Sequence, residues 1–325
     1  MGKKVRVACV QAEPAWNDLE AGVNKVIAII EEASGNNTQV LGFPEVFIPG
    51  YPWCMFLHPP ASNSDFFVKY LQNSMSMDSP QMRRIRAAVK RTGMFVVLGY
   101  SERHNGSMYI SQAFIDPKGE IVLNRRKIKP TNIERAYWGT GQGESLQTVV
   151  PTEFGRIGAL NCWEHTQPLL RYYEYEQNAE IHVASWPAMW DAKDSTDDTP
   201  LHQSSATMNQ RLSQVVAFEG ACVVLVCTQV MSEQNAERNG ITGWSDPQLP
   251  GGGFSMIYGA DGAPLCDPLP PGEEGILYAN VDLDENLKAK QLIDVVGHYS
   301  RPELLSLRVN THGARPVHHA YEPHQ

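Results

Sequence analysis

The sequence predicts an α/β fold in which helices cover mixed β-sheets. Three observations predict it. Strand-like apolar runs alternate with helix-like runs from end to end, the turn signal at residues 116–120 joins two strands as a hairpin, and no linker interrupts the pattern. The 325 residues are within the range of one α/β domain. We therefore expect a single domain over residues 1–310 and a C-terminal tail, residues 311–325, that is flexible or lies at an oligomer interface.

The first half of the chain alternates between short apolar runs and amphipathic segments. In its first amphipathic segment, Val23, Val26, Ile27 and Ile30 recur at helical spacing, which predicts a helix with one apolar face. Apolar runs bounded by turn residues predict strands. We expect strands at residues 5–11, 40–43, 94–101, 109–116 and 121–129, and helices at residues 19–33 and 80–92.

The second half repeats this order of strands and helices. We expect strands at residues 156–161, 181–185, 222–229, 254–258 and 275–281, and helices at residues 167–177, 203–218 and 284–291. Residues 51–66 and 232–252 show neither the helical nor the strand period of apolar residues, so we expect them to be irregular loops. Loops of this length in a compact domain are often functional.

Composition excludes several classes of protein. A net charge of −9 without any basic run argues against a nucleic-acid or anionic-membrane partner. No apolar stretch approaches the length of a membrane span, and the N-terminus lacks the apolar core of a signal peptide. The six cysteines are scattered and form no C-x-x-C pair, which is typical of reduced thiols rather than a zinc ribbon. We expect a cytoplasmic protein without a metal site.

Cys162 is the first candidate for chemistry. It lies in GALNCWEH, where an apolar strand ends and a helix begins. Backbone N–H groups converge at such a turn and favour a thiolate. A buried structural cysteine is the alternative, which we expect for Cys9, Cys222 and Cys227 inside apolar strands. At Cys162 the residues alone leave both interpretations open.

Glu45 is a candidate general base. It follows an apolar strand and begins a loop that contains Phe47, Tyr51 and Trp53. Removal of a carboxylate from water raises its pKa, which suits a base that works near neutral pH. A surface glutamate at a strand end is the alternative.

Lys127 and Lys129 lie two residues apart in RRKIKPT, and so on one face of a strand. A lysine directed at a developing anion stabilises it, whereas a basic strand edge is the structural alternative. Glu134, in PTNIERAYWG, is by itself indistinguishable from a surface ion-pair partner.

Five segments taken together resemble the nitrilase superfamily, and specifically its nitrilase branch. They are FPEVFIPGYP, RRKIKPTNIERAYWGTG, GALNCWEH, HVASWP and GHYSRPELLSL, in the family's order. The resemblance implies an αββα sandwich, in which two mixed β-sheets pack face to face and helices cover both sides. It also implies that Glu45, Lys127 and Cys162 are catalytic and that Glu134 is the supporting glutamate. Lys127 is preferred to Lys129 because the family's lysine directly follows the arginine pair.

The resemblance implies hydrolysis of an organic nitrile to the carboxylic acid and ammonia through a thioimidate and a thioester on Cys162. Lys127 and the Trp163 backbone N–H would stabilise the tetrahedral intermediate, and no metal or organic cofactor is needed. Tyr51, Trp163, Trp186 and His165 are expected around the substrate, with His165 ordering the site from behind. The partners are then a small nitrile, for which the aromatic loops favour aromatic or arylaliphatic types, and water.

Alternatives to a nitrilase remain at this point. An amidase, or an amide-forming enzyme of the nitrile or cyanide hydratase type, would use the same Glu–Lys–Cys set. A redox-sensing thiol protein and a structural filament protein belong to other classes. The resemblance also implies a homodimer or a larger spiral homo-oligomer. The helix after Cys162 fits this, because it carries Leu169, Leu170, Tyr172, Tyr173 and Tyr175.

Overall fold

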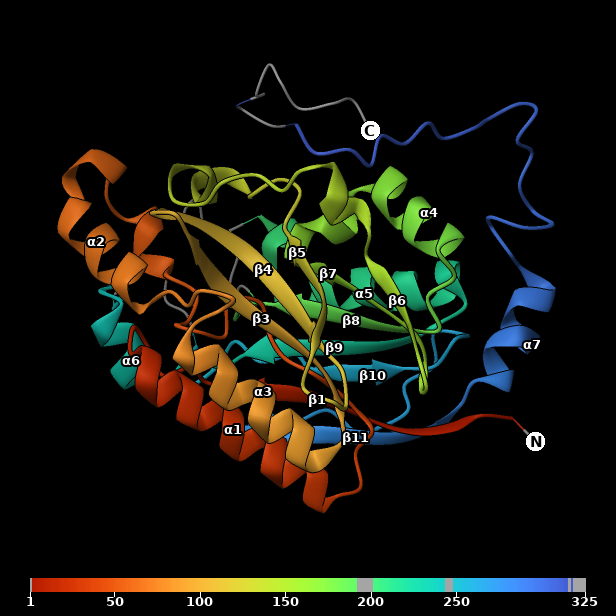
Figure 1. The fold of residues 1–325 in the computed structure, drawn as a ribbon, viewed down its shortest axis with the longest axis horizontal. Helices are drawn as coiled ribbons and strands as arrows, with labels where there is room; N and C mark the ends of the chain where they lie inside the picture. The colour runs from red at the N-terminus through yellow and green to blue at the C-terminus, as the bar shows by residue number, and fades with distance from the viewer. Residues whose placement is uncertain (1, 192–200, 243–247, 315–316, 318–325) are drawn as a thin grey trace.

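The structure is a computed structural model that describes residues 2–191, 201–242, 248–314 and 317. Its strands lie between two layers of helices (Figure 1). Along the sheet the strand order is β5-β4-β3-β2-β1-β9-β8-β7-β6, while β11 also pairs with β1 and β10 also pairs with β9. The strands divide into two half-sheets of similar architecture, one with β1 to β5 and β11 and the other with β6 to β10.

The first half-sheet is built on the parallel strands β1, β2 and β3, with antiparallel strands on either side. Its strands are β1 (Lys4–Ala12), β2 (Val40–Gly42), β3 (Phe95–His104), β4 (Ser107–Ile115), β5 (Ile121–Arg126) and β11 (Gly275–Asp282). The predicted turn at residues 116–120 joins β4 and β5, and the Asp116 side chain accepts hydrogen bonds from the Lys118 and Glu120 N–H groups there. The predicted hairpin is confirmed.

The second half-sheet repeats the pattern with parallel β7, β8 and β9 between antiparallel β6 and β10. Its strands are β6 (Val149–Thr152), β7 (Gly155–Asn161), β8 (Ile181–Trp186), β9 (Val223–Gln229) and β10 (Met256–Tyr258). A short parallel pairing, Gln11 with Thr228 and Ala12 with Gln229, joins the halves into one sheet. The predicted pair of mixed sheets is confirmed. The structure adds that the short pairing of β1 with β9 joins the two sheets where these two strands end.

The two half-sheets pack face to face on apolar side chains. Val7 and Val97 of the first half lie in the same buried cluster as Val183 and Leu225 of the second. Gly42 of β2 permits the close approach, because a Cβ there would lie 2.7 Å from Val183 Cγ1. Strands buried on both faces read as continuous apolar runs, as β9 does.

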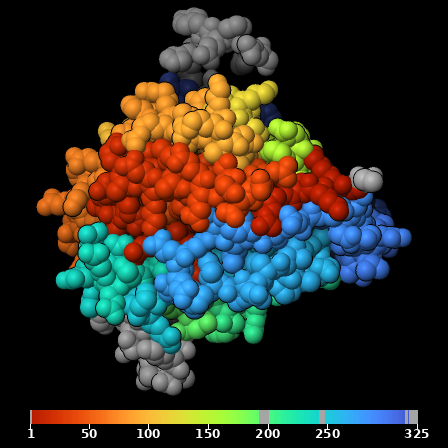
Figure 2. All heavy atoms as spheres, turned by 90° about the horizontal axis from the view of Figure 1, so that it is seen from below, coloured from red at the N-terminus to blue at the C-terminus, as the bar shows by residue number. Residues whose placement is uncertain are grey.

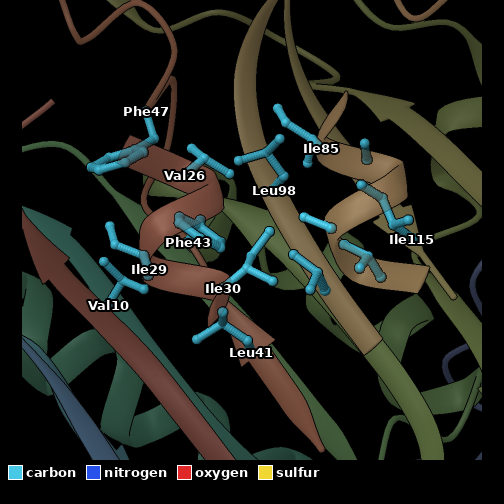
Figure 3. Close-up of a cluster of buried hydrophobic side chains, with 14 of the residues drawn as sticks. Val10, Val26, Ile29, Ile30, Leu41, Phe43, Phe47, Ile85, Leu98 and Ile115 are labelled. Carbon is cyan, nitrogen blue, oxygen red and sulfur yellow. The ribbon is translucent and has the colours of Figure 1, made fainter. Parts of the chain in front are cut away.

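Helices α1 (Leu19–Gly35) and α3 (Pro80–Thr92) cover the outer face of the first half-sheet. Figure 3 shows Val26, Ile29 and Ile30 of α1 and Ile85 of α3 directed toward strand residues such as Leu98. Burial of each such side chain is worth about 1.5–3 kcal/mol. Figure 2 shows the surface of this side, where the N-terminal and C-terminal parts of the chain lie side by side.

Helices α4 (Pro168–Glu176) and α5 (Ala206–Gly220) cover the second half-sheet, so the αββα order of layers is confirmed (Figure 1). Helix α7 (Asp284–Leu292) lies at the right-hand edge of the molecule in Figure 1. The chain after it runs outward and then returns over the side that carries α4. No helix in the described ranges is both long and apolar enough to cross a membrane.

Among the strands and α-helices of the described residues, three were not predicted: β6, α2 (Ser64–Asn73) and α6 (Glu233–Arg238). The prediction of two wholly irregular loops is wrong, because residues 51–66 contain the 3₁₀ turns Trp53–Phe56 and Pro60–Ser62 and residues 232–252 contain α6. Helix α2 forms because Phe66, Phe67, Tyr70 and Leu71 turn one face toward a buried aromatic cluster. Part of that cluster, Met108, Ile110, Tyr137 and Trp138, is distant in the sequence, so the pattern of α2 alone did not show what it packs against.

Candidate active site

Four of the predicted residues meet where the half-sheets end. Glu45 follows β2, Lys127 follows β5, Glu134 lies in the 3₁₀ turn Asn132–Ala136, and Cys162 follows β7. The Lys127 Nζ is 2.8 Å from Glu45 Oε1 and 2.9 Å from Glu134 Oε2. All four residues are at most 4% exposed. The structure therefore brings together a cysteine, two glutamates and one lysine in a space shielded from water.

The backbone around Glu45 is held by the first half-sheet. Phe43 N–H donates to the Val97 carbonyl, and Phe47 N–H donates to the Gly99 carbonyl. Gly99 is required there, because a Cβ would lie 2.1 Å from the Pro44 carbonyl oxygen. The loop that carries Glu45 therefore lies directly against β3.

The Glu45 carboxylate has one oxygen paired and one open. Oε1 accepts from Lys127, whereas Oε2 is buried and has no hydrogen-bond partner among the described residues. Burial raises the pKa of Glu45 to about 8, although Lys127 opposes the shift. A buried carboxylate with one free oxygen and a pKa near neutrality has the properties of a general base.

Two carboxylates favour the charged form of Lys127 despite its burial. Burial alone would lower its pKa, but the carboxylates of Glu134 and Glu45 raise it well above the ordinary value. The prediction that Lys127 and Lys129 share one face of a strand is wrong, because β5 ends at Arg126. The chain turns after that residue, so Lys127 is buried and Lys129 is exposed.

Glu134 holds Lys127 and is itself held by two donors. Tyr51 Oη donates to Glu134 Oε1 over 2.7 Å, and the Thr131 N–H donates to Oε2 over 2.6 Å. Tyr51, expected near the substrate, thus contacts the site through Glu134. That it also contacts substrate stays a prediction.

Cys162 sits at a sharp bend between β7 and the 3₁₀ turn Cys162–Thr166. Its φ of +45° lies in the left-handed region, which costs a residue with a Cβ roughly 1–2 kcal/mol. Burial and the Glu45 carboxylate raise the pKa of the thiol well above its ordinary value, while Lys127 and a hydrogen bond with the Trp163 N–H lower it. The resting cysteine is therefore a thiol that needs a base.

Arg125 and Glu164 tie the Lys127 segment to the Cys162 turn, and sequence reasoning missed them as a pair. Arg125 Nη1 and Nη2 lie 2.7 and 2.8 Å from the two Glu164 oxygens. These oxygens also accept from the Ile128 and Asn161 N–H groups. Burial alone would raise the pKa of Glu164, but Arg125 and these N–H groups hold it below its ordinary value. The sequence signal that could have found Arg125 is its position two residues before Lys127 in RRKIKPT.

The remaining predicted site residues surround Cys162 in packed positions. Trp186 is fully buried, stacks on His165 with ring centroids 5.1 Å apart, and donates from Nε1 to Ser213. Trp163 Nε1 donates to Asn209 Oδ1 over 2.8 Å. His165 is within hydrogen-bond distance of the Cys162 carbonyl. Contact of these three side chains with substrate stays a prediction.

A cavity of about 640 Å³ lies beside the cluster, between α4, the segment after β5 and the tail. Its lining includes Lys129, Trp163, Leu169 and Arg308, but none of the four clustered residues. No group of three or more His, Cys, Asp or Glu side chains in the described part of the chain is arranged to hold a metal ion.

The chain is similar to known carbon-nitrogen hydrolases in sequence and in fold. The family model for carbon-nitrogen hydrolases matches residues 6–291. The chain is 59% identical over 321 residues to a nitrilase from Penicillium rubens, covering 99% of this chain and 98% of that one. It is 56% identical over 310 residues to a nitrilase from Talaromyces marneffei, covering 95% and 96%. The crystal structure of Nit3 from Saccharomyces cerevisiae, a member of branch 10 of the nitrilase superfamily, superposes with a TM-score of 0.67 at 18% identity, covering 91% and 97%.

Proposed function

Because the chain belongs to the carbon-nitrogen hydrolase family, within the nitrilase superfamily, we propose that it hydrolyses an organic nitrile to the carboxylic acid and ammonia. The family resemblance predicted from the sequence motifs is confirmed, and the protein is a hydrolase of carbon–nitrogen bonds. The observation that carries the proposal is the buried contact of Lys127 with both Glu45 and Glu134 beside Cys162.

The first half of the reaction forms a covalent intermediate. Glu45 takes the proton of the Cys162 thiol, and the sulfur attacks the nitrile carbon. The proton then passes to the nitrile nitrogen, which gives a thioimidate. The free Oε2 of Glu45 supports this assignment, since it lies in the buried cluster without another partner among the described residues.

The second half of the reaction releases the products. Water, deprotonated by Glu45, adds to the thioimidate and forms a tetrahedral intermediate. Lys127 and the Trp163 N–H stabilise the negative charge that develops on its oxygen. The nitrogen is protonated and leaves as ammonia, and a second water hydrolyses the thioester to the acid and regenerates the thiol. Glu134 keeps Lys127 charged and in place throughout.

An ammonia-release screen with quantified products tests the proposal. Benzonitrile, phenylacetonitrile, a dinitrile and cyanide are offered, and acid and amide are measured by chromatography. We expect stoichiometric ammonia and acid from at least one organic nitrile. Amide as the sole product would contradict the nitrilase proposal and favour the amide-forming alternative, while turnover of amides alone would indicate an amidase.

We further propose that the enzyme assembles as a homodimer or a larger spiral through the side that carries α4. Leu170 and Tyr175 are buried, whereas Leu169 is 65% exposed. The tail after α7 exposes Leu304 and Leu305 at 66% and 82%, and a few residues further on Leu307 and Val309 line a cavity together with Leu169. Exposed apolar side chains that gather on one side of a protein are typical of interfaces.

The cytoplasmic compartment also stays a proposal. All six cysteines are unpaired in the structure, as expected for a protein kept in a reducing environment.

A further inference from the structure

Behind Cys162, a glutamate and two histidines form a hydrogen-bonded chain that ends on the backbone of the nucleophile. His165 Nδ1 lies 2.6 Å from the Cys162 carbonyl oxygen, and His165 Nε2 lies 2.8 Å from His182 Nε2. His182 Nδ1 is hydrogen-bonded to Glu174 Oε1. These three residues come from the turn after β7, from β8 and from α4, and none is more than 1% exposed.

The partners determine where the protons lie. A carbonyl oxygen only accepts, so His165 Nδ1 must carry a proton and donate it to Cys162. Burial, with His182 adding to it, lowers the pKa of His165 well below its ordinary value, so the ring is neutral and its Nε2 accepts. His182 Nε2 must then carry a proton and donate it to His165. Both N–H groups therefore point along the chain toward Cys162.

The Cys162 carbonyl belongs to the same peptide unit as the Trp163 N–H. A trans peptide is planar, with its carbonyl oxygen and its N–H directed to opposite sides. The hydrogen bond from His165 to the carbonyl oxygen therefore sets the direction of the N–H that contacts the Cys162 sulfur. Cys162 has a left-handed φ of +45°, so this peptide needs support to stay in its orientation.

We propose that His182 and Glu174 are positioning residues, which hold His165 in the tautomer that fixes the Cys162–Trp163 peptide and directs the Trp163 N–H at the developing oxyanion. The inference rests on the proposed function, because an oxyanion donor has a role only if Cys162 is the nucleophile. Glu174 and His182 touch neither the sulfur nor the clustered carboxylates, and they act through His165.

The hydrogen-bonded chain of Glu174, His182 and His165 is buried at a cost in free energy that apolar packing would avoid. Glu174 Oε2 is buried without a hydrogen-bond partner among the described residues, and such a group costs about 1–3 kcal/mol. Strand β7 leaves room for this carboxylate with Gly158, where a Cβ would lie 2.7 Å from Glu174 Oε1. Apolar side chains would fill the same space without the unsatisfied oxygen.

The test compares His182→Phe, which keeps a ring without nitrogen, with His182→Gln, whose amide N–H can replace the Nε2 donor. We expect His182→Phe to lower kcat on a nitrile roughly tenfold or more, short of the 10²–10³-fold loss of an entire oxyanion donor, with KM nearly unchanged. His182→Gln is expected to recover most of the lost kcat. Tyr175→Phe is the matched control, because it removes a hydrogen bond from the neighbouring position of α4 without touching the chain.

A second readout separates positioning from local collapse. Alkylation of Cys162 by iodoacetamide requires the thiolate, which the Trp163 N–H also contacts, but it develops no oxyanion, so its rate in His182→Phe is expected to fall much less than kcat. Equal losses in alkylation and in kcat, an unaffected kcat, or no recovery in His182→Gln would each overturn the inference. If His182→Phe does not accumulate as folded protein, Glu174→Leu is measured with the same two assays. A wild type inactive on every nitrile would instead overturn the proposed function, and the inference with it.

Discussion

Arg125 donates two hydrogen bonds, of 2.7 and 2.8 Å, to the two carboxylate oxygens of Glu164, and this pair joins the chain that leads to Lys127 with the turn that carries Cys162. Both side chains are at most 3% exposed. The cation and the nucleophile of the proposed reaction come from different half-sheets. Their relative position therefore depends on a contact between segments that are distant in the sequence.

Removal of this contact is expected to damage stability as well as rate. Arg125→Ala leaves Glu164 buried without its cation, and the loss of one partner of a buried pair costs about 3–5 kcal/mol. Urea unfolding measures this free energy. The control is Arg91→Ala, whose ion pair with Glu31 is more than half exposed and is expected to contribute about 0–1 kcal/mol. Similar losses in the two variants would contradict the buried role of Arg125.

The two lysines near the end of β5 are expected to differ sharply in their effect on rate. Lys127→Met removes the buried cation that contacts Glu45 and Glu134, so kcat should fall by about 10²–10³-fold. Lys129→Met changes an exposed residue and serves as the matched control. Steady-state kinetics on one nitrile compares them. Equal losses would remove the support for Lys127 as the oxyanion donor.

The pH dependence of kcat/KM should report Glu45. Its pKa is raised to about 8, mainly by burial, and only the ionised carboxylate accepts the thiol proton. We therefore expect kcat/KM to rise with pH and to level off above about pH 8, rather than near the ordinary value of 4.5. Glu134→Gln removes a negative charge that raises the pKa of Glu45, so the rising limb of its normalised profile should move to lower pH. A rising limb near pH 4.5 in the wild type would contradict this assignment.

The proposed assembly should be visible as mass in solution. Light scattering coupled to gel filtration is expected to give at least twice the 36.2 kDa of one chain. Leu169→Glu places a charge on the exposed face of α4 and should lower that mass, whereas Leu265→Glu, at a residue 41% exposed, is the control. A fully active monomer at micromolar concentration would refute the proposal.

The layers of the fold and the four clustered residues could be predicted because both correspond to local patterns in the sequence. Alternating apolar runs predicted most strands and helices, and Glu45 and Cys162 lie where a strand ends, which a linear pattern can indicate. The selection of Lys127 over Lys129 came from family resemblance. The physical reason is the end of β5 at Arg126, which strand periodicity could not show.

The residues that support Cys162 from behind show no such local pattern in the sequence. Glu174, His182 and His165 lie on different elements, and only the packing of α4 against β8 brings them into one chain. Similarly, the contact between Arg125 and Glu164 joins positions 39 residues apart in the sequence. The sequence also could not show that β1 and β9 join the two half-sheets, because only two residue pairs make that junction.

The proposed reaction requires Cys162 to be the nucleophile that attacks the nitrile. Intact-mass and peptide mass spectrometry of the wild type, quenched during turnover of a slow nitrile, tests it most directly. We expect an adduct of the substrate on Cys162, and no turnover in a folded Cys162→Ala variant. An adduct on another cysteine, or substantial activity in Cys162→Ala, would contradict it.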